Sequence, residues 1–379
     1  MLFPDFSGGM YLHIPFCKQA CHYCNFHFST SLHYKDDLVD ALCREISIKG
    51  RQFNAPKLKT IYLGGGTPSL LSAVDLQNIF NSIKTNFQVN AEAEITLEAN
   101  PDDINTDWLD MLQATPINRL SIGLQSFYNE HLTWMNRAHN EAEALQAIEL
   151  SQERGYHNLN VDLIFGFDSL SLTQLETELK IIVAKKIPHI STYNLTVEEQ
   201  TMLHKKIKRG EIQTPTEQTG VTHFLFIHEF LTQHGYAHYE ISNYALPGFE
   251  SQHNTAYWHG KPYLGIGPSA HSYFAETRSW NVSNNQQYIR ALKEGKIPQE
   301  SESLDDRTRY NELVMTSLRT QAGLSTAEIE LFGEDIYRHF ITKTLLLIKD
   351  GKIIQTDDRF ILSLEGMILS DHIFVELFY

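Results

Sequence analysis

Short apolar segments alternate with longer amphipathic segments over the first two thirds of the chain. Six of the short segments are rich in β-branched or aromatic residues and are bounded by Gly, Pro, Asn or Asp, as buried strands usually are. They begin at Tyr11, Thr60, Ala93, Arg119, Leu159 and His189. The segments between them, such as DDLVDALCREISIKGRQF, carry apolar residues at three- and four-residue spacing and are expected to form helices.

Six strand–helix units in series predict an α/β fold with a parallel sheet and right-handed crossovers. Six units are too few for a closed eightfold barrel, so we expect a partial (β/α)6 barrel. In an open sheet and in a barrel, ligands gather at the carboxyl ends of the strands. Polar or glycine-rich positions follow the apolar segments at Gly64–Thr67, Glu98, Gln125 and Asp162. Their equivalent places predict one shared site.

The remainder of the chain divides into two regions. From about Pro215 to Pro298 the pattern is irregular and rich in aromatic residues, glycines and histidines. Beyond Asp305, amphipathic segments precede KIIQTDDRFILSLEG, whose two adjacent aspartates are expected at the tip of a hairpin. Helices that end in a hairpin predict a small α+β module of the winged-helix type. We expect a core over 1–215, a barrel extension and linker over 216–300 and a C-terminal domain over 301–379.

The composition is that of an ordinary soluble globular protein, with 42% hydrophobic and 20% charged residues. A net charge of -15 argues against a general affinity for nucleic acid, which requires dense Lys and Arg. The C-terminal module is therefore expected to be a lid or packing element. No segment resembles a secretory signal or a membrane span, and the few cysteines do not form a disulfide framework, so we expect a cytoplasmic location.

Three of the four cysteines lie in CKQACHYC, directly after the first predicted strand. Cys17, Cys21 and Cys24 form the spacing CxxxCxxC. A structural zinc site would need a fourth ligand, such as His22 or His27. An iron–sulfur cluster with one iron free of protein ligands explains the count better, and the open iron can bind a small chelating molecule.

CxxxCxxC after a first strand resembles the cluster motif of the radical S-adenosylmethionine (SAM) superfamily, and GGGTP is similar to its glycine-rich element. YLHIPFC, GGGTP, LEANP, RLSIGLQSF and NVDLIFG, in this order, resemble the HemN/HemW family over nearly the whole chain. The resemblance implies that the three thiolates hold a [4Fe–4S] cluster whose remaining iron binds SAM. The SAM contacts that it implies are Tyr11, Gly65 and Glu98. For a second SAM, it implies contacts from Tyr23, Gly66, Thr67, Gln125, Arg137, Asp162 and Thr196.

Two features indicate the branch of this family. The porphyrinogen-oxidising branch resembles CxxxCxxCxC, whereas this chain has Phe26 at the place of the last cysteine, which the heme-chaperone branch also lacks. The segment HNTAYW resembles the HNxxYW heme-binding element of the chaperone branch. A neutral imidazole is a good axial ligand for heme iron, and aromatic rings can lie against a porphyrin. The heme contacts expected are His253, Asn254, Tyr257 and Trp258, with His259 and His271 as alternative ligands.

The resemblance therefore implies a heme chaperone that binds a [4Fe–4S] cluster, SAM and heme and delivers heme to acceptor hemoproteins. It implies respiratory acceptors, transient association with their membrane, and a partner that supplies electrons to the cluster. Cleavage of SAM to methionine and a 5′-deoxyadenosyl radical, and a purely organising role for SAM, both stay open. The alternative functions are an oxygen-independent coproporphyrinogen III dehydrogenase and a zinc-stabilised binding module.

Overall fold

The computed structural model describes residues 6–53 and 56–379. The six predicted strands are β1 (Ser7–Ile14), β2 (Lys57–Gly65), β3 (Gln88–Ala99), β4 (Arg119–Gln125), β5 (Leu159–Phe165) and β6 (His189–Asn194). They lie side by side in sequence order, and each pairs with the next in parallel. The predicted α/β fold with a partial (β/α)6 barrel is confirmed.

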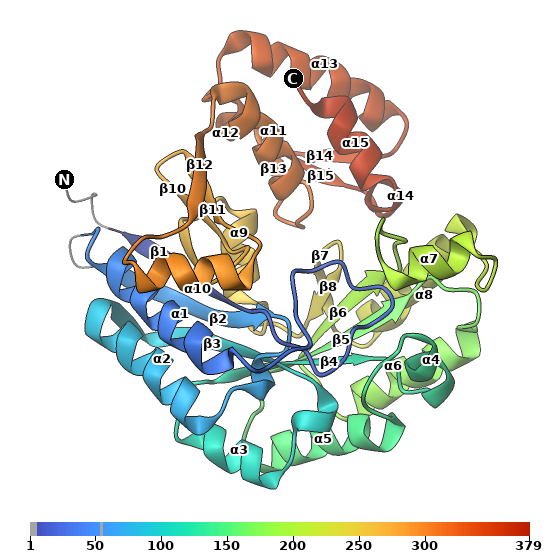
Figure 1. The fold of residues 1–379 in the computed structure, drawn as a ribbon. Helices are drawn as coiled ribbons and strands as arrows, with labels where there is room; N and C mark the ends of the chain where they lie inside the picture. Colours follow the sequence, from blue (N-terminus) through green and yellow to red (C-terminus); the bar gives the residue numbers. More distant parts are fainter. Residues whose placement is uncertain (1–5, 54–55) are drawn as a thin grey trace.

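Helices connect these strands and cover the outer side of the sheet (Figure 1). They are α1 (Lys35–Gly50), α2 (Ala73–Asn86), α3 (Thr106–Gln113), α4 (Asn129–Trp134), α5 (Glu141–Glu153) and α6 (Leu172–Ala184), with short 3-10 helices η1 (Pro68–Leu70) and η2 (Pro101–Asp103). The start of α2 is fixed by Ser72 and Asp75, whose side chains each bond the other's backbone N–H. Because helices cover the parallel strands, β4 is buried over almost its whole length, which explains its continuous apolar pattern.

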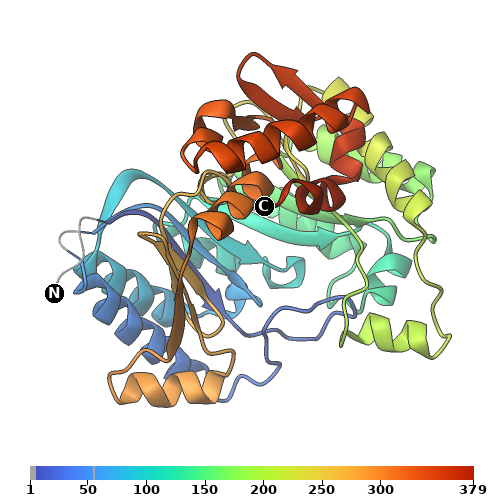
Figure 2. The same ribbon diagram turned by 90° about the horizontal axis from the view of Figure 1, so that it is seen from above.

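Residues beyond β6 extend the sheet at both edges. These elements are α7 (Met202–Lys208), α8 (Glu217–Gln233), β7 (Ala237–Glu240), β8 (Asn243–Ala245), α9 (Gln252–Trp258), β9 (Tyr263–Ile266), β10 (His271–Phe274), β11 (Thr277–Asn281), α10 (Asn285–Lys293) and β12 (Gln299–Ser303). Strand β8 pairs with β6, while β9 pairs in parallel with the far edge of β1. Figure 2 shows α10 beside α1, where Lys293 Nζ lies 2.8 Å from Asp37 Oδ1.

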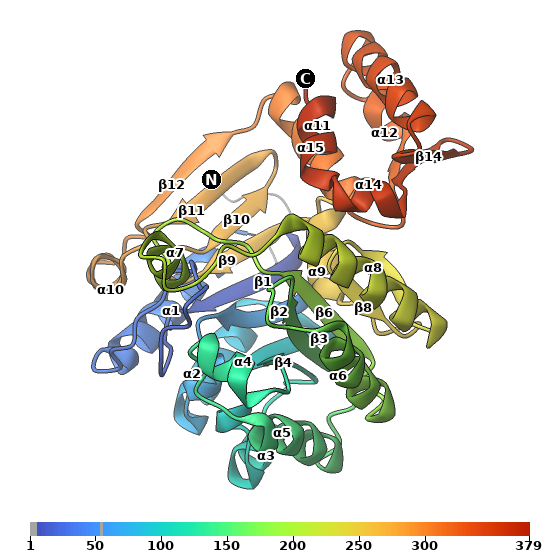
Figure 3. The same cartoon turned by 90° about the vertical axis from the view of Figure 1, so that its right-hand side faces the viewer.

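The C-terminal module has a hydrophobic core of its own, which includes Tyr310, Phe340 and Phe360. Its elements are α11 (Asp306–Ser317), β13 (Leu324–Ser325), α12 (Thr326–Glu330), α13 (Glu334–Lys349), β14 (Ile353–Thr356), β15 (Arg359–Leu362), α14 (Leu364–Ile368) and α15 (Ser370–Leu377). Strands β14 and β15 form the predicted hairpin, with Asp357 in the left-handed conformation at its tip. Figures 1 and 3 show this module on the side of the sheet opposite α3 and α5. No helix among the described residues is long and apolar enough to cross a membrane.

Candidate functional site

The three clustered cysteines lie in the loop between β1 and α1. Backbone hydrogen bonds hold this loop in place. One closes it on itself, from Cys17 N to the Ser29 carbonyl at 3.1 Å, and one joins its middle to the end of α4, from His22 N to the Met135 carbonyl at 3.0 Å. The thiols form no disulfide and are partly buried. Burial raises the pKa of the Cys17 thiol and raises that of Cys24 to about 11. Within the described residues, no group of three or more Cys, His, Asp or Glu side chains is arranged to hold a metal ion.

The guanidinium group of Arg137 lies against this cysteine loop. Its Nη1 donates to Cys21 Sγ at 3.3 Å, and its Nη2 donates to Asn100 Oδ1 at 2.7 Å and to the Gly123 carbonyl at 2.8 Å. The Tyr23 hydroxyl is also hydrogen-bonded to Cys21, and burial raises its pKa well above the usual tyrosine value. A buried cation at this position favours the thiolate form of the neighbouring cysteines.

A second contact ties the cysteine loop to two neighbouring loops. Lys18, between the first two cysteines, lies 2.7 Å from Asp102 Oδ2 and is also paired with Asp103. The other Asp103 oxygen accepts a hydrogen bond from Ser69 Oγ at 2.6 Å. Since Ser69 follows the glycine-rich segment and Asp103 follows β3, this carboxylate links the loops after β1, β2 and β3.

The GGGTP segment passes closely beside the residues that follow β1. A Cβ on Gly66 would stand 2.6 Å from the carbonyl oxygen of Phe16, so only glycine fits there. Gly65 has φ +106°, and a Cβ there would meet the imidazole of His13 at 2.4 Å. Thr67 is buried and is hydrogen-bonded to the first thiol of the cysteine loop. The glycines therefore bring the backbone and Thr67 up to the cysteine loop.

Two carboxyl groups lie at the ends of neighbouring strands. Glu98 accepts hydrogen bonds from the Tyr62 hydroxyl at 2.8 Å and from Gly65 N at 3.0 Å. Burial, together with the nearby Asp162, raises the pKa of Glu98 to about 7. Asp162 Oδ1 accepts from Asn160 Nδ2 at 2.7 Å, and burial raises its pKa as well. This pair of carboxyl groups suits a ligand that carries an amino or sulfonium group.

Of the remaining residues expected to contact SAM, Tyr11 and Gln125 lie on strands of the barrel, and Thr196 lies in a loop. The Tyr11 hydroxyl lies 3.0 Å from His13 Nδ1 beside the same strand ends. Gln125 closes β4 in a buried, left-handed conformation with φ 66°, which is strained for a non-glycine residue. Thr196 is exposed in the loop after β6. The fold thus brings the expected residues together at the carboxyl ends of the strands, whereas no contact described in the structure joins Thr196 to them.

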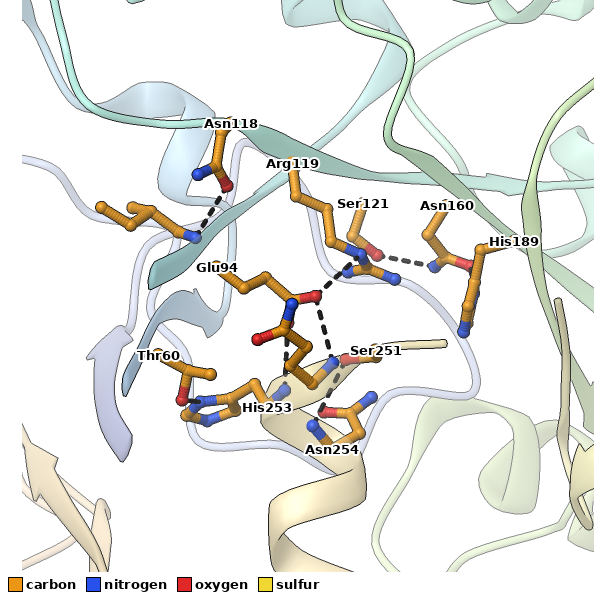
Figure 4. Close-up of polar contacts among 12 residues, drawn as sticks. Thr60, Glu94, Asn118, Arg119, Ser121, Asn160, His189, Ser251, His253 and Asn254 are labelled. Atoms are coloured by element: carbon orange, nitrogen blue, oxygen red, sulfur yellow. Dashed lines mark hydrogen bonds and ion pairs between the residues drawn. The ribbon is translucent and has the colours of Figure 1, made fainter. Parts of the chain in front are cut away.

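His253 is the second residue of α9, and its imidazole is almost fully enclosed. Its Nδ1 lies 2.7 Å from Thr60 Oγ1 (Figure 4). Its Nε2 lies 2.7 Å from the Tyr257 hydroxyl, and its ring stacks on Tyr62. Burial lowers the pKa of His253 to about 3, so the ring is neutral at physiological pH. Because Thr60 and Tyr257 each contact one ring nitrogen, both nitrogens of His253 are engaged in hydrogen bonds within the fold.

A buried carboxylate anchors the start of α9 on the barrel. Glu94 of β3 accepts hydrogen bonds from the backbone N–H groups of Gln252 and His253, each at 3.0 Å. Arg119 of β4 lies 3.9 Å from the same carboxylate and is itself buried (Figure 4). Because an anion is stabilised at a helix N-terminus and by a nearby cation, this ion pair fixes the helix that carries the HNxxYW element.

A cavity of about 1330 Å³ lies between the barrel and the C-terminal module. Asn254, Tyr257 and Trp258 line it, and Arg319 covers Trp258 at 4.8 Å from the ring centroid. Phe26, with 68% of its surface exposed, lies at the same cavity. Pockets for drug-sized ligands usually measure roughly 300–1,000 Å³. The cavity is thus large enough for a ligand the size of a porphyrin.

The sequence analysis did not predict several residues that lie at the site: His13, Lys18, Tyr62, Asn100 and Asp103. Two of them carry a usable signal, because Asn100 and Asp103 lie just beyond the carboxyl end of β3. Lys18 lies inside the cysteine motif, but only its contact with η2 reveals its role.

Two family models match the chain. The model described as the radical SAM superfamily matches residues 11–181, and the HemN C-terminal domain matches residues 304–369. Among solved structures, coproporphyrinogen III oxidase (HemN) from Escherichia coli, described as a radical SAM enzyme, superposes with a TM-score of 0.85 at 26% sequence identity. That superposition covers 99% of this chain and 91% of the oxidase. The fold and the cysteine loop are those of a radical SAM protein.

The curated relatives indicate to which family within the radical SAM superfamily this chain belongs. The heme chaperone HemW of Lactococcus lactis is 32% identical over 359 residues, which cover 92% of this chain and 93% of the relative. The heme chaperone HemW of Bacillus subtilis is 31% identical over 368 residues, with coverage of 96% and 97%. This chain belongs to the HemW family.

Proposed function

We propose that this protein is a heme chaperone, which holds heme in the cavity between the barrel and the C-terminal module and passes it to acceptor hemoproteins. The observation that carries the proposal is the cavity itself, because all four named residues of the HNxxYW element line it together with other aromatic side chains. Flat aromatic walls suit a porphyrin, and the size of the cavity permits one. The names of the curated relatives support the same function.

The proposal includes a [4Fe–4S] cluster and SAM, which the match to the radical SAM superfamily model and the contact of Arg137 with the Cys21 sulfur support. Cys17, Cys21 and Cys24 would hold the cluster, with Arg137 at the Cys21 sulfur offsetting the negative charge of the thiolates. If it is bound and reduced, such a cluster would be able to supply one electron for cleavage of SAM, a reaction that stays open here. Tyr11, Gly65 and Glu98 would bind that SAM, and the proposed contacts of a second SAM are Tyr23, Gly66, Thr67, Gln125, Arg137, Asp162 and Thr196.

A specific observation favours a second candidate function. The likeness to coproporphyrinogen III oxidase extends over nearly the whole chain, which is compatible with an oxygen-independent coproporphyrinogen III dehydrogenase. Phe26 argues against it, because it stands where the resemblance places the extra cysteine of that branch. Incubation of the reconstituted protein with coproporphyrinogen III, SAM and a reductant distinguishes the two, since formation of protoporphyrinogen would favour the dehydrogenase.

Heme binding is tested directly by titrating the anaerobically reconstituted protein with ferric heme and following the Soret band in difference spectra. We expect saturable binding of one heme per chain, and no binding would refute the chaperone function. Metal analysis of the anaerobically purified protein addresses the zinc alternative. Iron and sulfide in similar amounts support the cluster, whereas zinc without iron favours a zinc-stabilised module.

We further propose that the acceptors are respiratory hemoproteins, reached by a cytoplasmic protein in transient contact with their membrane, and that a separate donor reduces the cluster. The test is to mix heme-loaded protein with membranes that contain heme-free respiratory hemoproteins. Transfer of the heme absorbance to the membrane fraction is expected. Retention of all heme on this protein would contradict delivery.

A further inference from the structure

Five histidines line the cavity, and they differ in how many of their ring nitrogens are hydrogen-bonded. His13 and His253 have both ring nitrogens hydrogen-bonded, and His27 has one. His259 and His271 form no ring hydrogen bond within the described residues, and both are exposed. An imidazole can bind iron only through a nitrogen whose lone pair is free. The two free rings are thus the strongest candidates for a metal ligand.

His271 is better positioned than His259. It opens β10, where it is paired with Trp280 of β11, and its ring stacks on the Trp280 ring at a centroid distance of 6.1 Å. His259 instead follows the last residue of α9. A ligand on a strand, with its ring supported by a neighbour, holds its geometry more accurately than one in a loop. Partial desolvation of the ring beside its neighbours in the cavity wall, with the nearby Arg278, lowers the pKa of His271, which favours the neutral ring that can bind a metal.

The cavity walls around His271 carry side chains suited to the porphyrin ring and to the propionate groups of heme. Tyr273, Arg278 and His271 all line the cavity from the β10–β11 hairpin. Lys261 and Arg359 also line it, and neither has an acidic partner within the described part of the chain. Heme carries two propionate groups, so two unpaired cations at one cavity provide a counter-charge for each.

We infer that His271 is the iron ligand of the heme held in this cavity. The inference rests on the proposed heme-binding function and assigns its central contact. His253 then acts as a positioning residue, whose hydrogen bonds to Thr60 and Tyr257 fix the helix that forms one wall. The bond formed is from a ring nitrogen of His271 to ferric iron, and no electron transfer is required.

The experiment compares wild type, His271→Ala, His259→Ala and His253→Ala. Each protein is titrated with ferric heme and, separately, with iron-free protoporphyrin IX. Loss of an iron ligand weakens only the binding of the metalloporphyrin. We therefore expect His271→Ala to bind heme about tenfold or more weakly, to bind protoporphyrin as wild type does, and to regain the wild-type heme spectrum on addition of imidazole. His259→Ala, the matched control from the same cavity, should resemble wild type.

The outcomes separate the inference from the function on which it rests. No binding of either porphyrin by wild type would overturn both. Normal heme binding by His271→Ala, with a loss in His253→Ala or His259→Ala, would overturn the assignment of His271 while leaving the chaperone function intact. An equal loss of heme and protoporphyrin binding in His271→Ala would show that the residue shapes the cavity and does not bind the iron.

Discussion

The hydroxyl of Tyr257 lies 2.7 Å from Nε2 of His253, one turn earlier on α9. Because Thr60 lies equally close to Nδ1, the imidazole joins α9 to β2 from within the barrel wall. The motif that resembles a heme-binding element thus has a structural task in this fold, in addition to the cavity surface that its other side chains provide.

Replacement of Tyr257 by Phe removes one of these two bonds. We expect the free energy of unfolding to fall by about 1–3 kcal/mol, because a buried ring nitrogen loses its partner. Urea denaturation followed by circular dichroism measures this. Tyr273→Phe is the matched control, since the Tyr273 hydroxyl lines the same cavity without a hydrogen bond in the described structure. Equal stability of Tyr257→Phe and wild type would contradict the role of the bond.

Arg137 is expected to set the reduction potential of the cluster. The Arg137→Gln variant loses a cation and a hydrogen bond at the Cys21 sulfur, both of which favour the reduced state, so the potential should fall. A charge-assisted bond of this kind corresponds to a shift on the order of 60 mV. Redox titration monitored by electron paramagnetic resonance gives the value. Arg154→Gln, at an exposed ion pair with Asp110, should leave it unchanged.

The Asp103 carboxylate should control how firmly the cysteine loop holds its cluster. In Asp103→Asn the ion pair with Lys18 is lost while an oxygen remains for Ser69. We expect iron release to a chelator to become about tenfold faster, a usual effect of disturbing residues that orient metal ligands. Asp37→Asn, which breaks the exposed pair with Lys293, should release iron at the wild-type rate. Identical rates in all three proteins would exclude this role.

The carboxyl group of Glu98 predicts a pH dependence. Its folded pKa of about 7 is raised from 4.5, so its contribution to stability is complete below pH 4.5 and is lost as the pH rises through about 7. Glu98→Gln should therefore gain stability relative to wild type across this window, by up to about 3 kcal/mol. Thermal unfolding across the pH range measures the difference, and SAM binding should weaken in the same variant.

Glu178 offers the matched control for this pH dependence. Burial raises its pKa to about 7 as well, but it bonds Ser126 and the backbone of Phe127, away from the cysteine loop. Glu178→Gln should show the same pH-dependent gain with unchanged SAM binding. A Glu98→Gln variant whose stability follows wild type at every pH would contradict the raised pKa.

The parallel core could be predicted from the sequence because its strands are buried on both faces and read as apolar runs between turn residues. The individual strands that extend the sheet beyond this core could not be predicted. Strand β12 (Gln299–Ser303) is exposed at every position and carries no apolar signal, and β8 (Asn243–Ala245) spans only three residues. Their place in the sheet depends on pairing with strands far away in the sequence.

The residues at the strand ends of the candidate site could also be predicted from the sequence, whereas its long-range contacts could not. The rule that ligands gather at strand ends leads to Glu98 and Asp162 before any coordinates are known. The hydrogen bond from Arg137 to Cys21 joins residues 116 positions apart, and the one between Thr60 and His253 spans 193 positions. Long-range contacts of this kind leave no periodicity in the sequence, so the occupied ring nitrogens of His253 could not be foreseen.

Strand β1 is synthesised long before β9, the strand with which one of its edges pairs. Domains tend to fold from the N-terminus as synthesis proceeds, yet one edge of β1 has no partner until the chain reaches Tyr263–Ile266. Until then the nascent barrel presents an open row of backbone donors and acceptors to other chains, which is a known route to aggregation. Nascent or truncated chains that end between β6 and β9 should therefore depend strongly on cellular chaperones to stay soluble.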